Sequence, residues 1–158
     1  YFMGNSIKII PAQLSNIDEM IPILELFFRD IEKRCPEKKW NETEVRQLID
    51  FGIKNDDACV FIALIENLIV GVGAGIKNKG FLNPNPVFIE GILHALPNLS
   101  AVTKYKIINL LLNELEKWAK NNNCSHIILG LDRTTTMPKF VENKGYVESE
   151  ISYKKELI

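Results

Sequence analysis

The sequence predicts an α/β (α+β) domain, and three observations support this class. The 158 residues are 46% hydrophobic and 25% charged, which is typical of a globular chain long enough for one domain. Short β-rich runs are interspersed with helical patterns along the whole chain. No apolar run reaches the roughly 18 residues of a membrane span. We therefore expect a single domain over residues 3–158, and we set Tyr1 and Phe2, which precede Met3, aside as candidate vector residues.

A short strand and two helices are expected first. The β-branched run at 7–10 predicts a strand that ends at a proline. Apolar residues then recur at helical spacing over 17–31, which predicts a helix that ends near residue 35. Asn41 and Glu44 form a capping pair at the start of a second helix over 41–54.

The middle of the chain predicts a hairpin and a further strand. Two β-rich runs at 58–65 and 68–76 are separated by the polar pair Glu66 and Asn67, which is typical of a two-residue hairpin turn. Another β-rich run follows at 87–96 and ends at a proline. These segments predict three consecutive strands.

The last third of the sequence predicts two helices and two strands. Apolar residues at helical spacing over 102–122 predict a long amphipathic helix. The apolar run at 127–131 predicts a strand buried on both faces. A short helix at 137–143 is followed by Gly145, which supplies a left-handed stop, and by an extended segment at 146–157.

Charge and cysteine content exclude several classes of function. Nineteen basic and twenty acidic residues give a net charge of -1, so the chain is not expected to bind nucleic acid or a membrane surface. The three cysteines form no C-x-x-C pair and only two histidines accompany them, so we predict no metal site. An odd cysteine count favours the reducing cytoplasm over a disulfide-linked secreted fold.

Several segments together resemble the GNAT superfamily of acetyl-coenzyme-A-dependent N-acetyltransferases. Residues 60–71 are similar to the second and third strands of that family, and 110–120 are similar to its long third helix. The tail at 140–146 and 153–157 is similar to its short helix, Gly-aromatic pair and Tyr-x-Lys-x-Leu strand. The resemblance implies a mixed, mostly antiparallel sheet flanked by about four helices. It also implies that strands four and five part around the pantetheine arm of acetyl-CoA.

The expected cofactor site departs from the family pattern. The family usually carries an Arg/Gln-x-x-Gly-x-Gly/Ala loop at the start of the long helix, but no glycine occurs here between Gly91 and Gly130. The free N–H groups of a helix N-terminus stabilise a phosphate, and hydroxyl and ammonium groups could replace some backbone contacts. The residues expected to contact acetyl-CoA are Leu93, Ala95, Ser100, Thr103, Lys104, Tyr105, Lys106 and Thr134. The alternative hypothesis is a GNAT-fold binding or assembly protein with a degenerate cofactor site and no transferase activity.

Two residues of the fourth strand are the catalytic candidates. Strict alternation along 87–96 places Glu90 and His94 on one face of the sheet, together with Phe88 and Ile92. Relatives often use a strand-four glutamate as base, so Glu90 is the first candidate for the proton acceptor. His94 titrates near neutrality and is the second candidate. A rim glutamate in solvent and a structural histidine are the ordinary alternatives.

The general acid and the acceptor are less well defined. The family commonly has a tyrosine where this sequence has Val141, so Tyr146, Tyr105 or a water would have to protonate the leaving thiolate. The resemblance implies direct attack by a primary amine of a small molecule or peptide. Trp40 and Phe81 are the candidate walls of the acceptor site.

Association of two copies is also predicted. Gly71, Gly73 and Gly75 alternate along one strand and therefore share a face, where something could pack closely. Together with a terminal strand at a sheet edge, this face suggests a homodimer.

Overall fold

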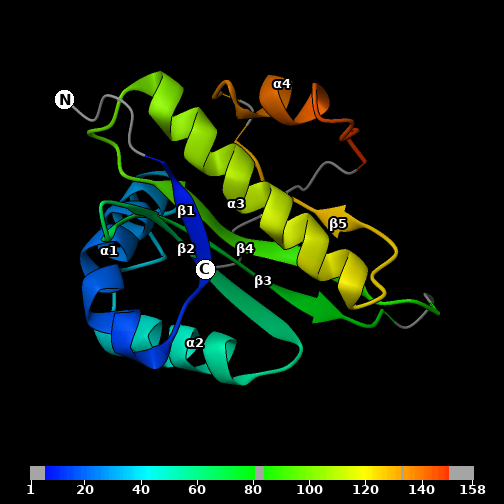
Figure 1. Cartoon of the computed structure of the whole chain (residues 1–158), viewed down its shortest axis with the longest axis horizontal. Coiled ribbons are helices and arrows are strands. Elements are labelled where there is room, and N and C mark those ends of the chain that lie inside the picture. Colours follow the sequence, from blue (N-terminus) through cyan, green and yellow to red (C-terminus); the bar gives the residue numbers. More distant parts are fainter. Residues whose placement is uncertain (1–5, 81–83, 133, 150–158) are drawn as a thin grey trace.

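The computed structural model describes residues 6–80, 84–132 and 134–149, which form a five-stranded sheet with helices on both faces (Figure 1). In chain order the elements are β1 (Lys8–Pro11), η1 (Leu14–Asn16), α1 (Ile17–Arg34), α2 (Glu42–Lys54), β2 (Ala58–Ile65), β3 (Leu68–Asn78), β4 (Val87–Ala95), α3 (Ala101–Asn121), β5 (Ile127–Ile128) and α4 (Met137–Glu142). The predicted α/β class with about four helices is confirmed. None of the helices in these ranges is long and apolar enough to cross a membrane.

The sheet follows the chain, in the order β1-β2-β3-β4-β5. The first four strands pair antiparallel, and β4 and β5 pair parallel. A parallel pair needs a long crossover, which α3 provides between these two strands. The expected mixed, mostly antiparallel sheet is therefore confirmed.

Local sequence signals account for several boundaries. The Asn41 side chain accepts a hydrogen bond from the Glu44 N–H at 3.3 Å and caps α2, as predicted. Glu66 and Asn67 have φ values of 51° and 65°, the left-handed pair that a type I′ hairpin turn requires. Gly145 has a φ of 91° and stops α4 with a bond from the Tyr146 N–H to the Val141 carbonyl.

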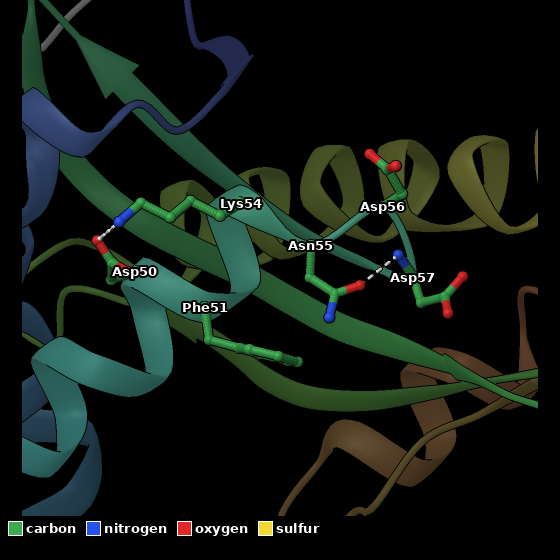
Figure 2. A pocket seen from close by; sticks show the side chains of 6 residues that line it. All are labelled: Asp50, Phe51, Lys54, Asn55, Asp56 and Asp57. Atoms are coloured by element: carbon green, nitrogen blue, oxygen red, sulfur yellow. Dashed lines mark hydrogen bonds and ion pairs between the residues drawn. The ribbon is translucent and has the colours of Figure 1, made fainter.

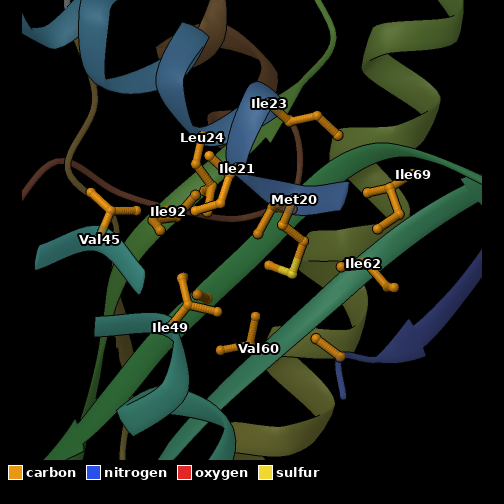
Figure 3. Close-up of a cluster of buried hydrophobic side chains, with 13 residues drawn as sticks. Met20, Ile21, Ile23, Leu24, Val45, Ile49, Val60, Ile62, Ile69 and Ile92 are labelled. Carbon is orange, nitrogen blue, oxygen red and sulfur yellow. The ribbon is translucent and has the colours of Figure 1, made fainter. Parts of the chain in front are cut away.

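The helices form two layers that bury separate clusters of apolar side chains. On one face, α1 and α2 pack over β2 and β3, with Met20, Leu24 and Ile49 fully buried against Ile62 (Figure 3). On the other face, α3 crosses the sheet, and α4 lies beside its first half (Figure 1). The strands in the middle of the sheet are covered on both sides, which explains their continuous apolar sequence.

The glycines of β3 are explained by α3. A Cβ added at Gly71 would lie 2.6 Å from Cγ2 of Ile107, and one at Gly73 would lie 3.4 Å from Cβ of Leu111. The missing side chains let α3 approach the sheet closely. The predicted glycine face exists, but α3 covers it, so it offers no surface to a second copy of the chain.

Two strand predictions differ from the structure. The strand expected at 127–131 is shorter, because the ladder of β5 spans only Ile127–Ile128. Of the extended segment expected at 146–157, residues 146–149 form no strand, and the rest lies outside the described residues. The early end of β5 leads to the candidate active site.

Candidate active site

The site begins where β4 and β5 stop pairing. The two strands are in register at Phe88 with Ile127 and at Ile89 with Ile128. β4 then continues to Ala95 while paired with β3. Among the described strands, the second half of β4 is therefore bonded on one side alone. The edge of β4 that faces β5 is unpaired here, and we call the space between the two strands the gap. It lies near the carboxyl ends of two parallel strands, where α/β sheets commonly bind ligands.

A β-bulge explains why the strands part. Gly75 is in register with Glu90 and Ala74 with Ile92, so Gly91 is an extra residue on β4. A bulge bends its strand and increases the local twist. This bend comes directly after Ile89, the last residue that pairs with β5.

The bulge also interrupts the regular alternation of side chains that was predicted along β4. Phe88 packs in the α3 layer, whereas Ile92 belongs to the α1 and α2 cluster. The two residues therefore lie on opposite faces, although strict period-two alternation placed them together. The prediction that Glu90 and His94 share a face, which rested on the same alternation, is wrong for the same reason.

Beyond the bulge, backbone groups of β4 point into the gap. The Leu96 N–H donates to the Val70 carbonyl at 2.9 Å, so these two residues form a hydrogen-bonded pair. In an antiparallel ladder such pairs alternate with pairs whose N–H and C=O groups point outward. Ala95 lies opposite Gly71, and Leu93 lies opposite Gly73. Both pairs are of the type without mutual hydrogen bonds, so the N–H and C=O groups of Ala95 and Leu93 point away from β3 and into the gap.

Glu90 spans the start of the gap with its side chain. One more step of the parallel ladder would direct the Gly130 N–H to the backbone of β4. Instead, this N–H donates to Oε2 of Glu90 at 3.3 Å. Burial raises the pKa of the Glu90 carboxyl to about 7, and the bond from Gly130 opposes the rise. The carboxyl can therefore hold or release a proton near neutral pH.

His94 lies in a different environment, against α1. Its ring centroid is 5.4 Å from that of Phe27. Its Nε2 atom is buried and has no hydrogen-bond partner among the described residues. Burial lowers the pKa of His94, and the negative charge of Asp30 opposes the shift. The structure does not bring His94 together with Glu90, so the two candidates do not form one catalytic pair.

The start of α3 lies after the carboxyl end of β4, beside the gap. Ser100 caps the helix by accepting a bond from the Thr103 N–H at 3.2 Å, and the two hydroxyls are 2.9 Å apart. The Lys104 ammonium lies 3.4 Å from the Pro97 carbonyl, while Lys106 is exposed. Two hydroxyls, one directed ammonium and the positive helix end thus occur where the glycine loop was expected.

The tyrosines considered as general acid have other partners. The Tyr105 hydroxyl contacts the Thr136 hydroxyl, and its ring packs on Phe140, which joins α3 to α4. The Tyr146 hydroxyl donates to Glu116 Oε1 at 2.7 Å, on the later half of α3. Tyr146 is therefore directed away from the gap, whereas Tyr105 lies near the start of α3. Val141, which by the sequence resemblance stands where the family commonly has a tyrosine, is buried.

An ion pair joins α1 to the loop after β5. Nη1 of Arg34 lies 2.9 Å from Oδ2 of Asp132, and the same guanidinium pairs with Asp30. The other carboxylate oxygen of Asp132 accepts from the Thr134 N–H and hydroxyl, at 2.8 Å and 2.7 Å. These bonds and Arg34 lower the pKa of Asp132. The Thr134 hydroxyl, a predicted cofactor contact, is thus engaged by Asp132.

Of the two residues predicted to line the acceptor site, the structure describes one. Trp40 is half-buried and packs on Phe28 of α1, with ring centroids 5.9 Å apart. Its ring therefore contributes to the α1 and α2 layer, and a role toward the acceptor stays a prediction. Phe81 lies outside the described residues.

A hollow on the surface is remote from this chemistry. It has a volume of about 700 Å³ and is formed at the end of α2 by Asp50, Phe51, Lys54, Asn55, Asp56 and Asp57 (Figure 2). Several of its polar groups have partners: Lys54 pairs with Asp50, the Asn55 side chain accepts from the Asp57 N–H, and the Asp57 carboxylate pairs with Lys77 of β3. The hollow shares no residue with the gap. In the ranges that the structure covers, no group of three His, Cys, Asp or Glu side chains is placed to hold a metal ion.

Sequence reasoning missed three features of the site. The Gly130 N–H and the Arg34–Asp132 pair depend on contacts between distant parts of the chain, for which the sequence carries no signal. The bulge did leave a signal, because a glycine inside a strand pattern often marks one. Gly91 was the available clue.

Comparison with known proteins decides the family. The model of the Acetyltransferase (GNAT) family matches residues 26–139, which is more than half of the chain. The chain belongs to the GNAT acetyltransferase family. No curated protein sequence matches this GNAT chain.

Solved structures support the same fold at low sequence identity. The aminoglycoside N-acetyltransferase AAC(6')-Iy, in complex with CoA, has a TM-score of 0.78 at 12% identity, over 98% of this chain and 97% of its own. The ribosomal-protein-alanine N-acetyltransferase from Brucella melitensis biovar Abortus 2308 has a TM-score of 0.72 at 12% identity, over 97% and 99%. A transcriptional regulator from Bacillus halodurans C-125 has a TM-score of 0.75 at 17% identity, over 96% and 100%. At these identities the likeness concerns the fold alone.

Proposed function

We propose that this GNAT protein is an N-acetyltransferase that transfers an acetyl group from acetyl-CoA directly to a primary amine. One observation carries the proposal: the carboxyl of Glu90, with a pKa of about 7, lies at the point where β4 and β5 part. A carboxyl there can take a proton from an attacking amine.

We propose that acetyl-CoA binds along the gap and the start of α3. The outward backbone groups of Leu93 and Ala95 would hydrogen-bond to the pantetheine amides, and Thr134 would lie near the same arm. The start of α3 would hold the pyrophosphate through its N–H groups, Ser100, Thr103, Lys104 and Lys106, with Tyr105 beside them. When bound, acetyl-CoA supplies an activated acyl group on a tolerable leaving group.

Glu90 would act as the general base. In its ionised form it accepts a proton from the ammonium of the acceptor, so that the nitrogen lone pair becomes available for attack. A new C–N bond then forms at the acetyl carbonyl carbon while the C–S bond to CoA breaks. The second proton that the nitrogen loses on becoming an amide goes to the departing thiolate. The Gly130 N–H holds Oε2 of Glu90 and fixes the carboxylate at the start of the gap.

The leaving group does not require the usual tyrosine. A free cysteine thiol has a pKa of roughly 8.5, and a thiol of similar acidity can leave as the thiolate without full protonation. Tyr105, near the start of α3, is the remaining side-chain candidate for proton donation, while Tyr146 is held by Glu116. The burial of Val141 is therefore compatible with turnover.

The names of the similar solved structures suggest which acceptor amines to test. Two of them are named for amines of different size, an aminoglycoside and the alanine of a ribosomal protein. We propose a small-molecule or peptide amine as the acceptor here, with no part for nucleic acid or membrane. We also propose a cytoplasmic location, supported by three free cysteines.

A binding or assembly protein without transferase activity is the second candidate. The absence of glycine at the start of α3 favours it, because Ser100 already satisfies the Thr103 N–H that a phosphate would otherwise use. The Glu90 carboxyl at the gap opposes it, since a binding module has no need of a buried titratable group.

Calorimetric titration of acetyl-CoA, followed by an assay of thiol release with a panel of amines, tests the proposal. Binding at 100 times the dissociation constant should stabilise the fold by roughly 2.7 kcal/mol.

Replacing Lys104 and Lys106 with alanine should raise KM for acetyl-CoA much more than it lowers kcat, because their charge acts on binding.

The matched control replaces Lys117 and Lys120 at the other end of α3. It should leave KM unchanged. Equal KM values for the two double variants would remove the phosphate role, and the lack of any calorimetric or thermal response to acetyl-CoA would leave the second candidate.

A further inference from the structure

Arg34, at the end of α1, is joined to the segment that follows β5. Its Nη1 atom lies 2.9 Å from Oδ2 of Asp132, although the two residues are 98 positions apart in the sequence. Asp30, one turn earlier on α1, accepts a bond from Nη2 of the same guanidinium at 3.2 Å. The Arg34 side chain is therefore held on two sides, by its own helix and by the segment after β5.

The same face of α1 also contacts β4. Phe27 and Arg34 are about two helical turns apart, so both side chains lie on one face of the helix. The ring of Phe27 packs on His94 of β4, with ring centroids 5.4 Å apart. α1 thus contacts β4 through Phe27 and the segment after β5 through Arg34, and it connects the two sides of the gap.

Two polar contacts join residues 130–132, just after β5, to other elements of the described chain. The Gly130 N–H donates to Oε2 of Glu90, and Asp132 accepts from Arg34. The other carboxylate oxygen of Asp132 accepts from the Thr134 N–H and hydroxyl, which makes the backbone turn tightly here. The position of Asp132 therefore constrains the position of Gly130, because a single residue lies between them.

The ion pair is poorly suited to a purely stabilising role. The side chains of Arg34 and Asp132 are 47% and 23% exposed. Exposed ion pairs contribute little to the free energy of unfolding, because water and salt screen their charges. The main consequence of the pair is therefore expected in the position of the segment after β5.

We propose that Arg34 is a positioning residue for the transfer reaction, because through Asp132 it holds the Gly130 N–H against the Glu90 carboxylate. The role in the reaction rests on the proposed function, whereas the hold on Glu90 rests on the contacts alone. Arg34 would act on the reaction only through Glu90, the proposed base.

The pKa of Glu90 reports whether the hold is intact. Burial raises this pKa to about 7, and the bond from the Gly130 N–H opposes the rise. The charged groups on neighbouring elements have partners of opposite charge, since Lys77 of β3 and Arg34 of α1 each pair with an aspartate. Among the described residues, no charged side chain contributes to the shift. A loosened segment should weaken the Gly130 bond and raise the pKa further.

Two variants with opposite changes in charge test the hold. Arg34→Gln removes a positive charge, Asp132→Asn removes a negative one, and both break the ion pair. Acting through charge alone, the first variant would raise the pKa of Glu90 and the second would lower it. Loss of the hold instead raises the pKa in both. Complete loss of a hydrogen bond to a charged group shifts a pKa by about one unit, so we expect about half a unit for a loosened segment.

The pKa is measured without turnover, by following the side-chain carboxyl carbon of Glu90 by NMR from pH 5 to 9. Glu90→Gln identifies the signal. Arg29→Gln is the matched control, because Arg29 lies on the same helix, is 55% exposed and pairs with Glu25 and Glu32. It should leave the pKa of Glu90 unchanged. Arg34→Lys keeps a charged donor and should restore most of the native value.

The same shift should appear in the kinetics. At saturating acetyl-CoA, the acidic limb of the pH-rate profile should move up by the same half unit in Arg34→Gln and in Asp132→Asn. This shift lowers kcat/KM for the amine at pH 6 by about threefold. The loss should be smaller at pH 8.5, where the carboxyl is ionised in all variants, and Tm should stay close to the native value.

The possible results separate the hold on Glu90 from the transferase function. A raised pKa in both variants without acetylation of any amine would support the hold and reject the transferase function, and with it the role in the reaction. Opposite pKa shifts in the two variants would overturn the hold and assign the effect to charge. A native pKa in Arg34→Gln would also overturn it, while the transferase function would stand on its own assay.

Discussion

The two halves of β4 have the same kind of sequence but different surroundings. At Phe88 and Ile89 the strand is paired on both sides, with β3 and with β5. From Ile92 to Ala95 it is paired with β3, and its other edge faces the gap. The first half is an ordinary interior strand, whereas the second half offers backbone donors and acceptors to a ligand.

The difference comes from the extra residue Gly91. The bulge separates the strands, and the Glu90 side chain then takes the Gly130 N–H that the ladder would have bonded. The bulge also places the two titratable side chains of β4 in different environments. Glu90 lies at the gap, and His94 packs against α1. A single bulge thus provides both the opening and the isolated carboxyl.

Deleting Gly91 should have the largest effect, because it removes the difference between the two halves. The flanking residues would come into regular register with Gly75 and Ala74 without changing faces, so the fold should persist. β4 and β5 could then pair farther, and the gap would close. We expect acetyl-CoA binding, measured by calorimetry, to weaken at least tenfold and transfer to fall to background.

Gly91→Ala is the control for the deletion. Gly91 has no positive φ, and an added Cβ would approach the Ala74 carbonyl oxygen at 3.9 Å, an ordinary contact. This variant keeps the bulge and should bind acetyl-CoA normally. Native affinity in the deletion variant would show that the bulge does not create the cofactor site.

Exchanging each titratable group of β4 for glutamine should distinguish the two halves in catalysis. Glu90→Gln keeps the side-chain volume and an oxygen for the Gly130 N–H, but it removes the basicity. The rate should fall by roughly 10² to 10⁴ if proton transfer is limiting, and the acidic limb of the pH-rate profile should disappear. His94→Gln should retain that limb, since His94 lies in the α1 layer. Native turnover of Glu90→Gln from pH 6 to 9 would assign the proton to another acceptor.

The pH dependence of stability should differ in sign between the two residues. The pKa of Glu90 rises from 4.5 to about 7 on folding, so the folded state binds more protons between these values. Its contribution is fully present below pH 4.5 and is lost as the pH rises through 7, by up to roughly 3 kcal/mol. The lowered pKa of His94 acts in the opposite direction, because stability is lost as the pH falls below 6.5.

Thermal unfolding from pH 4.5 to 8 measures both effects. Relative to Glu90→Gln, the native protein should lose up to roughly 6 to 12 °C in Tm across this range, as expected for a chain of this size. Relative to His94→Gln, it should gain Tm as the pH rises. Parallel Tm curves for native protein and Glu90→Gln would mean that the carboxyl is not perturbed by folding.

Much of the fold could be predicted because its signals are local. Periodicity located α1, α2 and α3, and turn chemistry located the Glu66–Asn67 hairpin and the stop at Gly145. The candidate site was predicted in part: Glu90 was chosen as the carboxylate of β4, and the structure places it at the gap. Its pairing with His94 was wrong, because a regular alternation was assumed across a bulged strand.

The sequence by itself determined the order of the elements, the apolar faces that the helices bury and the presence of one carboxylate on β4. These properties depend on side chains a few residues apart, which obey the periods of helix and strand. Only the tertiary structure decided that Gly91 is bulged, that β5 ends at Ile128 and that the Gly130 N–H meets Glu90. The physical reason is that these features arise from contacts between neighbouring strands and across the crossover through α3, where packing of distant segments outweighs local preference.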